Sequence, residues 1–178
     1  MQNKPAKKLK WRKLFTSLFG GIFIFLVLWI NYKNISLKKN LKKGDKLPII
    51  TYRSNLGMKN INIDSTQNTV IIIFDEECDF CEILLKEINE NIDSNIRSNF
   101  YFFNILEKKE TVPFPYPKIE KSPNTYIGYI NSRIAFDSLD IKATPTTFII
   151  NPDTILVNKI KGAVKYSFID RAINNSGN

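Results

Sequence analysis

The longest hydrophobic segment of the chain lies close to its N-terminus. Residues 14–30 carry no charged side chain, and the run contains the polar residues Thr16 and Ser17. A buried core helix would show a polar stripe, and a cleaved signal peptide would be followed by a small-residue cleavage site. Neither feature is present. With its flanking residues the run is about 30 Å long as a helix, close to the apolar thickness of a bilayer. We therefore predict one N-terminal transmembrane signal-anchor helix over residues 14–32.

The hydrophobic pattern from residue 44 onward predicts a folded domain. Residues 69–74 form a continuous, largely β-branched run, which is typical of a strand buried on both faces. After Phe80, apolar side chains recur every four residues and predict an amphipathic helix. A second apolar strand is expected at residues 100–106. These three segments form a β-α-β unit, which indicates the α/β class.

Shorter patterns complete the domain. Strands are predicted at residues 49–53 and 61–63 around a turn at Gly57, a hairpin at residues 146–150 and 155–160, and a closing helix at residues 166–173. The prolines between residues 107 and 125 predict an irregular loop. Residues 126–139 are ambiguous, with some helical character near residues 133–139. The expected fold has a central mixed β-sheet flanked by helices.

The positive charge of the chain is concentrated before residue 47. The formal net charge is +9, and residues 1–46 carry twelve Lys and Arg against one acidic residue. Residues 47–178 carry fourteen basic and sixteen acidic residues, a net charge of −2. A nucleic-acid-binding domain would need a basic face of its own. We therefore expect no nucleic-acid partner.

The position of the basic residues also predicts an orientation for the anchor. Lys10, Arg12 and Lys13 adjoin the N-terminal end of the apolar run, and on the far side only Lys33 is equally close. By the positive-inside tendency, the basic flank of residues 1–13 is expected in the cytoplasm. A polar tether would then cover residues 33–43, and the domain of residues 44–178 would be extracytoplasmic.

The candidate chemistry lies at two cysteines, Cys78 and Cys81, separated by two residues between the predicted strand and helix. This spacing allows the two sulfurs to bond and places the first at a helix N-terminus. There the backbone N–H groups and the helix dipole stabilise a thiolate. Cys78 is therefore the candidate nucleophile, and the more shielded Cys81 is the candidate resolving cysteine. Such a pair needs no histidine, and the sequence contains none.

Three other interpretations of the cysteine pair remain. A zinc site would need ligands from two chains, because two cysteines without histidine supply half of a tetrahedral set. A purely structural disulfide would gain little from closing so small a loop. Two unrelated buried cysteines are also possible, although the strand and helix around them favour a redox pair. We predict no metal ligands and no cofactor beyond a redox-active Cys78–Cys81 disulfide.

The order of motifs resembles the thioredoxin superfamily, and more narrowly the membrane-anchored bacterial TlpA-like thiol–disulfide oxidoreductases. The motifs are Gly44-Asp45-Lys46-Leu47-Pro48, the strand before Cys78-Asp79-Phe80-Cys81, the segment Ala143-Thr144-Pro145-Thr146-Thr147 before another strand, and Gly162. The resemblance implies a thioredoxin-like fold over about residues 44–175. It also implies that Pro145 is cis and lies against the two sulfurs, and that the backbone of Thr144 pairs with an extended substrate.

The same resemblance implies the partners and the location. The expected substrates are disulfide-containing or dithiol proteins, and a membrane partner would supply electrons. The chain would be a single-pass protein of the bacterial inner membrane with its domain in the periplasm. A non-catalytic thioredoxin-fold module for binding or assembly is the alternative function, and a metal- or haem-delivery tether is a weaker one.

The residues around the pair differ from the family pattern. Glu77 stands where an aromatic residue is usual, and Asp79 and Phe80 form the inner dipeptide. Five acidic residues surround the pair, namely Asp75, Glu76, Glu77, Asp79 and Glu82. Their charge opposes thiolate formation at Cys78. We therefore predict modest reactivity and a preference for basic or neutral partners, with Glu77, Asp79 and Phe80 as residues that modulate the site.

Overall fold

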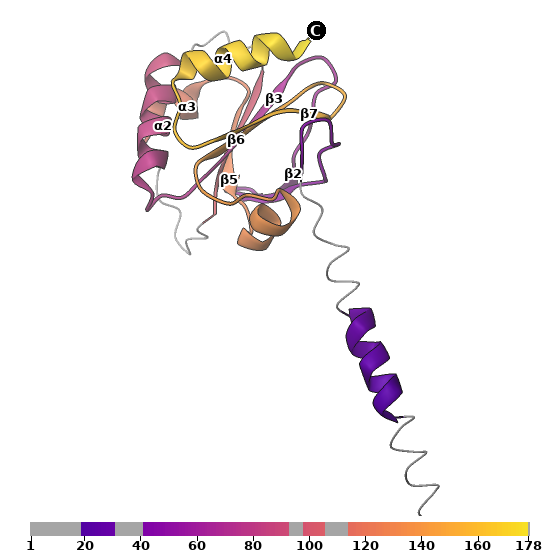
Figure 1. Cartoon of the computed structure of the whole chain (residues 1–178). Coiled ribbons are helices and arrows are strands. Elements are labelled where there is room, and N and C mark those ends of the chain that lie inside the picture. Colours follow the sequence, from indigo (N-terminus) through magenta and orange to yellow (C-terminus); the bar gives the residue numbers. More distant parts are fainter. Residues whose placement is uncertain (1–18, 31–40, 93–97, 106–113, 178) are drawn as a thin grey trace, which may run out of the picture. The chain divides into compact units, whose positions relative to one another are not determined.

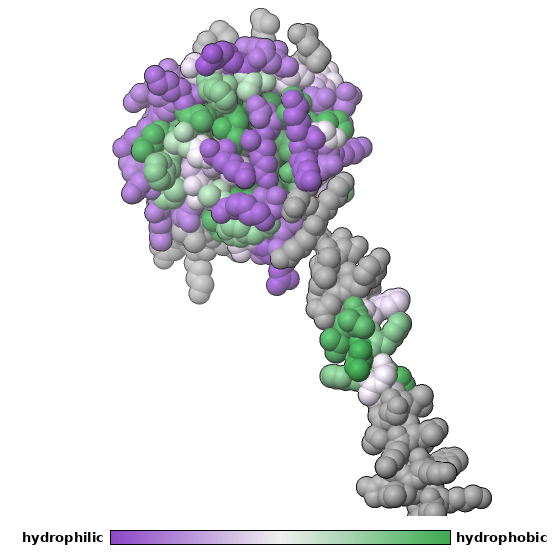
Figure 2. Space-filling model, viewed as in Figure 1, coloured by the Kyte–Doolittle hydropathy of each residue, from purple (hydrophilic) through white to green (hydrophobic). Residues whose placement is uncertain are grey.

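The computed structural model describes residues 19–30, 41–92, 98–105 and 114–177. The chain divides into two compact units, Met1–Lys39 and Asn40–Asn178. In the first unit, residues 19–30 are helical and their large apolar side chains are exposed, as the green segment of Figure 2 shows. Among the described residues, no helix is long and apolar enough to cross a membrane.

Several predicted segments lie outside the described residues. These are the basic flank of residues 1–13, residues 14–18 and 31–32 of the predicted anchor, and residues 33–40 of the tether. The transmembrane anchor therefore stays a prediction. The last residues of the predicted tether are described, and there Leu41 is buried in the core of the second unit.

The described residues of the second unit form a seven-stranded mixed sheet with the order β2-β1-β5-β4-β3-β6-β7 (Figure 1). The strands are β1 (Thr51–Ser54), β2 (Gly57–Asn60), β3 (Thr69–Phe74), β4 (Asn99–Asn104), β5 (Thr125–Tyr129), β6 (Thr146–Ile150) and β7 (Leu156–Lys161). Strands β3, β4 and β5 are parallel neighbours, and the other pairs are antiparallel. This arrangement confirms the α/β class and the central mixed sheet.

Helices cover one face of the sheet. They are α2 (Asp79–Asn91), α3 (Pro117–Lys121) and α4 (Tyr166–Asn174), and Ile88, Ile119 and Ile169 from them pack into one buried cluster with β3, β4 and β6. The opposite face is covered by the first residues of the second unit, around Leu47, and by the π-helix η1 (Ile134–Ser138). A short 3-10 helix, η2 (Asn175–Gly177), ends the described chain. The central strands β3, β4 and β6 are therefore buried on both faces.

The most hydrophobic strands form where the sequence predicts them. β3 and β6 have the predicted bounds, because all of their residues are buried and both runs are continuous. β3-α2-β4 is a parallel crossover unit, and β6 and β7 form the predicted antiparallel hairpin. Helix α4 also forms where the closing helix was predicted.

The predicted strand at residues 61–63 is wrong. The chain turns at residues 55 and 56, so that Gly57 begins β2 opposite Ser54 and the pairing ends at Asn60 opposite Thr51. Each of the four residues of β1 pairs with one residue of β2, so β2 also has four residues and ends before Ile61. Ile61 and Ile63 instead pack against the core cluster as irregular chain.

The region between β4 and β6 is more regular than its sequence indicates. Within the described part of the predicted loop, α3 begins at Pro117, a position where a missing N–H costs nothing. The ambiguous segment holds β5, which pairs in parallel with β4, and η1, which lies within the stretch of predicted helical character. Residues 107–113 of the predicted loop lie outside the described residues.

Replacing Gly128 tests the junction between β5 and β1. A Cβ atom on Gly128 would lie 2.6 Å from the carbonyl oxygen of Arg53 and 2.7 Å from Cδ2 of Tyr52. Gly128→Ala should therefore lower the free energy of unfolding by about 2 kcal/mol in urea denaturation, since the backbones must move apart. Met58→Ala, at an exposed strand position, should change it by less than about 0.5 kcal/mol. Equal effects of the two changes would contradict the close approach.

Candidate functional site

Both cysteines lie where β3 ends and α2 begins. Cys78 is the N-cap residue of α2 and is half-buried, and Cys81, in the first turn, is 1% exposed. The turn between strand and helix is fixed by Asp75, whose carbonyl accepts the Cys78 N–H at 3.2 Å and whose carboxylate accepts the Glu77 N–H at 2.9 Å. The buried strand therefore delivers Cys78 to the helix N-terminus, as the sequence predicts.

The segment before β6 reaches the same place. β6 pairs antiparallel with β3, with Thr146 opposite Ile73, so the start of β6 lies beside the end of β3. The peptide bond between Thr144 and Pro145 is cis, and Pro145 is buried. The Cys78 thiol donates to the Thr144 carbonyl oxygen, with 3.6 Å between sulfur and oxygen. The structure thus brings Cys78 and Cys81 together with Thr144 and Pro145.

The environment of Cys78 favours its thiolate. Burial raises the pKa of Cys78, but hydrogen bonds to the sulfur from the Cys81 thiol, the Thr144 side chain and the backbone N–H groups of the first turn outweigh burial. The net effect is a Cys78 pKa below that of an ordinary thiol. Backbone N–H groups at a helix N-terminus carry partial positive charge, so they stabilise an anion there.

Cys81 has the opposite character. Burial and the hydrogen bond that its thiol makes with Cys78 raise the pKa of Cys81 to about 12. The backbone N–H of Asp75 lies 3.4 Å from the Cys81 sulfur and partly offsets this increase. At neutral pH, the reduced pair therefore holds its proton on Cys81 and any negative charge on Cys78.

The predicted modulating residues lie beside Cys78 on the surface. Glu77 and Asp79 are exposed, and the ring of Phe80 is 64% exposed. Solvent screens exposed carboxylates strongly, so their effect on Cys78 should be smaller than that of the hydrogen bonds. Glu82, another of the five acidic residues, pairs with Lys86 at 2.6 Å. The influence of these acidic residues on the thiol stays a prediction.

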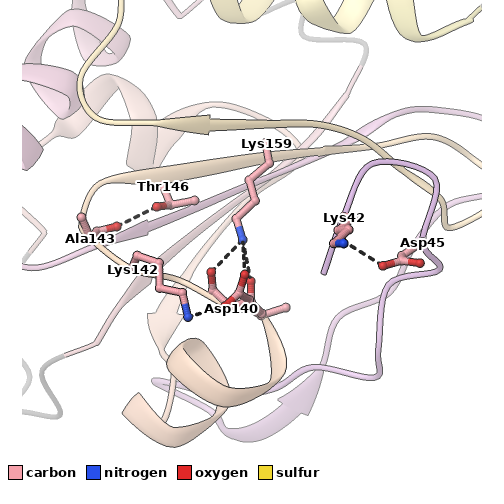
Figure 3. A network of polar contacts seen from close by, with 8 residues as sticks. Lys42, Asp45, Asp140, Lys142, Ala143, Thr146 and Lys159 are labelled. Carbon is pink, nitrogen blue, oxygen red and sulfur yellow. Dashed lines mark hydrogen bonds and ion pairs between the residues drawn. The ribbon is translucent and has the colours of Figure 1, made fainter. Parts of the chain in front are cut away.

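Two contacts of the site were not anticipated from the sequence. One is the contact of the Asp75 backbone N–H with the Cys81 sulfur. It could not be anticipated, because a backbone donor leaves no signal in the residue types. The other is Lys159, a partly buried lysine on β7 whose ammonium bonds to the chain just before Thr144 (Figure 3). The residue type gives no signal for Lys159, since a lysine in a strand normally indicates a solvent-facing side chain.

Comparisons with known proteins agree with this fold. The model of a family described as a thioredoxin-like domain matches residues 55–176. A comparison with curated proteins gives no match. This family match confirms the thioredoxin-like fold inferred from the motifs.

Solved structures share the fold at low sequence identity. The thioredoxin domain of a thiol-disulfide oxidoreductase from Bacteroides vulgatus is 19% identical with a TM-score of 0.52, covering 76% of this chain and 100% of its own. The exposed lipoprotein thioredoxin of Streptococcus pneumoniae is 12% identical with a TM-score of 0.56, covering 72% and 99%. StoA from Bacillus subtilis is 14% identical with a TM-score of 0.52, covering 70% and 96%.

The two thiols should react differently with a neutral alkylating reagent. In the reduced protein, iodoacetamide should modify Cys78 at neutral pH and leave Cys81 unmodified until the protein is unfolded. Because the folded-state pKa of Cys78 is lowered, its alkylation rate should rise with pH through a midpoint below that of an ordinary thiol and then level off. Mass spectrometry of peptides after timed quenching measures both rates. Faster modification of Cys81 than of Cys78 would contradict the assignment.

Proposed function

The chain belongs to the thioredoxin-like domain family, and from that premise we propose that it is a membrane-tethered thiol–disulfide oxidoreductase. The observation that carries the proposal is that two neighbouring thiols have pKa values shifted in opposite directions. Cys78 has a lowered pKa at the helix N-terminus, and Cys81 beside it is a buried thiol with a raised pKa. Thiolate attack on a disulfide requires one such activated sulfur and one reserved for the second step.

The first step would be attack by the Cys78 thiolate on one sulfur of a substrate disulfide. A bond forms between Cys78 and that sulfur, and the other substrate sulfur leaves as a thiolate that takes a proton from water. Cys78 is suited to this role because it is the more exposed of the pair and its thiolate accepts hydrogen bonds. The product is a mixed disulfide between chain and substrate.

The second step would use Cys81. Its thiol loses a proton to water, the sulfur attacks Cys78, and the remaining substrate sulfur leaves with the bonding electron pair and takes a proton from water. The N–H of Asp75, 3.4 Å from the Cys81 sulfur, can stabilise the thiolate as it forms. The net result is transfer of two electrons from the dithiol to the substrate, leaving a Cys78–Cys81 disulfide. A dithiol donor at the membrane would reduce this disulfide again.

Thr144 and Pro145 would hold the substrate. The Thr144 carbonyl already faces Cys78, and Thr144 is only partly buried at the entry to β6. An extended peptide lying along this segment could pair with its backbone as an added strand, which would place a cystine over Cys78. Exposed Phe80 and the exposed carboxylates of Glu77 and Asp79 border the same position, so apolar segments with basic or neutral residues are the preferred partners.

Serine variants of the two cysteines separate this activity from a binding role. Cys78→Ser should lower exchange with a peptide disulfide at least a hundredfold, an order-of-magnitude expectation for loss of a nucleophile. Cys81→Ser should instead accumulate a mixed disulfide, which non-reducing electrophoresis and mass spectrometry detect. Met58→Ala, on the sheet edge away from the cysteines, serves as the control. If Cys78→Ser kept full function in its host, the alternative of a non-catalytic binding module would replace this proposal.

The tether would be the helix predicted over residues 14–32. Its support is the uncharged apolar run and the helical residues 19–30, whose large side chains are exposed. The basic cluster at residues 10–13 favours a cytoplasmic N-terminus, which would place the domain in the periplasm. The tether would thereby keep the redox site near a membrane electron donor.

Charge introduced into the apolar run tests the anchor. Leu26→Lys combined with Phe23→Lys should release the chain from membranes in carbonate extraction, since each lysine costs about 3 kcal/mol at the centre of a span. The unchanged chain should stay in the membrane pellet, and external protease should digest its domain in spheroplasts. A wild-type chain found entirely in the carbonate supernatant would contradict the anchor and leave the redox proposal intact.

A further inference from the structure

Lys159 is a cation in an unusual position. It lies on β7, and its side chain is 13% exposed, whereas burying an ammonium group without partners is costly. Burial lowers its pKa, and the nearby carboxylate of Asp140 acts in the opposite direction. The ammonium also lies 5.3 Å from the ring centroid of Phe148. Such a site needs strong hydrogen bonds to remain charged.

The bonds of Lys159 all go to one short segment. Its Nζ donates to the carbonyl oxygens of Leu139 at 3.1 Å and Asp140 at 2.7 Å, and lies 3.7 Å from Oδ2 of Asp140 (Figure 3). Asp140 has a positive φ of 50°, a conformation that residues other than glycine rarely adopt. The ammonium therefore offsets the cost of a turn that would otherwise be disfavoured.

This turn leads directly into the catalytic segment. We call residues 139–145 the proline loop. It begins at the carbonyl oxygens bound by Lys159 and ends at Pro145, whose carbonyl oxygen accepts the Gly162 N–H at 2.8 Å. Lys159 lies on β7 and Gly162 directly follows its last residue, so the same stretch of chain holds both ends of the proline loop. Thr144, between these two points, contacts the Cys78 sulfur.

We propose that Lys159 is a positioning residue that holds the proline loop at the distance from Cys78 needed for substrate docking. This inference deepens the proposed function and rests on it. Lys159 would not touch the substrate. Its two hydrogen bonds fix the start of the loop, the Gly162 bond fixes the end, and the Thr144 backbone is thereby kept ready to pair with a peptide.

The test compares two reactions of Cys78 in matched variants. Exchange with an extended peptide disulfide needs both the thiolate and the loop backbone, whereas alkylation by iodoacetamide needs the thiolate alone. In Lys159→Met, kcat/KM for exchange should fall about tenfold, mainly through a higher KM, because a misplaced docking group weakens productive binding. Alkylation of Cys78 should stay within about twofold of wild type. Lys161→Met makes the same change at an exposed position of β7 and should alter neither rate beyond twofold.

A second readout does not depend on activity. Exchange of the Gly162 amide, which donates to Pro145, should become about tenfold faster in Lys159→Met, whereas the Ile105 amide, which donates to Phe74, should be unchanged. If Lys159→Met does not fold, Lys159→Gln replaces it in both measurements. If the wild-type chain performs no exchange, the proposed function fails, and the Gly162 amide still tests the loop.

Two results would overturn the role of Lys159. One is a Gly162 amide that exchanges at the wild-type rate in the Lys159 variant. The other is an equal loss of peptide exchange and alkylation, which would mean that Lys159 supports only the overall fold.

Discussion

The site depends on one contact between distant parts of the chain, that of the Cys78 sulfur with the carbonyl oxygen of Thr144 at 3.6 Å. The two residues are 66 positions apart, and the contact exists because β3 and β6 are fully buried antiparallel neighbours in the sheet. Cys78 follows the end of β3, and Thr144 and Pro145 stand just before the start of β6. Any shift of β6 against β3 would therefore change this contact.

The sheet supplies the rigidity that this contact needs. The residues of β3 and β6 are fully buried, with aromatic rings of β4 on both sides of the sheet. Burial at this density keeps strand positions fixed, because a shift would open a void or a clash. The same packing gives the two cysteines different exposure. Cys81 lies inside the helix-covered cluster, and Cys78 lies at its margin. Packing thus buries the Cys81 sulfur and leaves Cys78 partly exposed.

The sequence predicts the parts of the fold that are set by continuous apolar runs. β3, β6 and the cysteine-bearing helix are of this kind, and Cys78 at the helix N-terminus follows from them. β5 was ambiguous because its pairing depends on the absence of a side chain at Gly128, which allows β1 to approach. The place of Lys159 was not predicted, since a lysine in a strand normally indicates a solvent-facing side chain. The cis bond before Pro145 was expected only from the resemblance to a known family.

The most direct test of the account is the redox equilibrium of the Cys78–Cys81 pair in glutathione buffers, followed by mass spectrometry after rapid alkylation. We expect a reversible two-electron couple between dithiol and internal disulfide, in which a tenfold change in the equilibrium constant corresponds to about 30 mV. Replacement of either cysteine by serine should abolish this couple. A pair that stays reduced in the most oxidising buffer, or that forms only mixed disulfides with glutathione, would contradict the account.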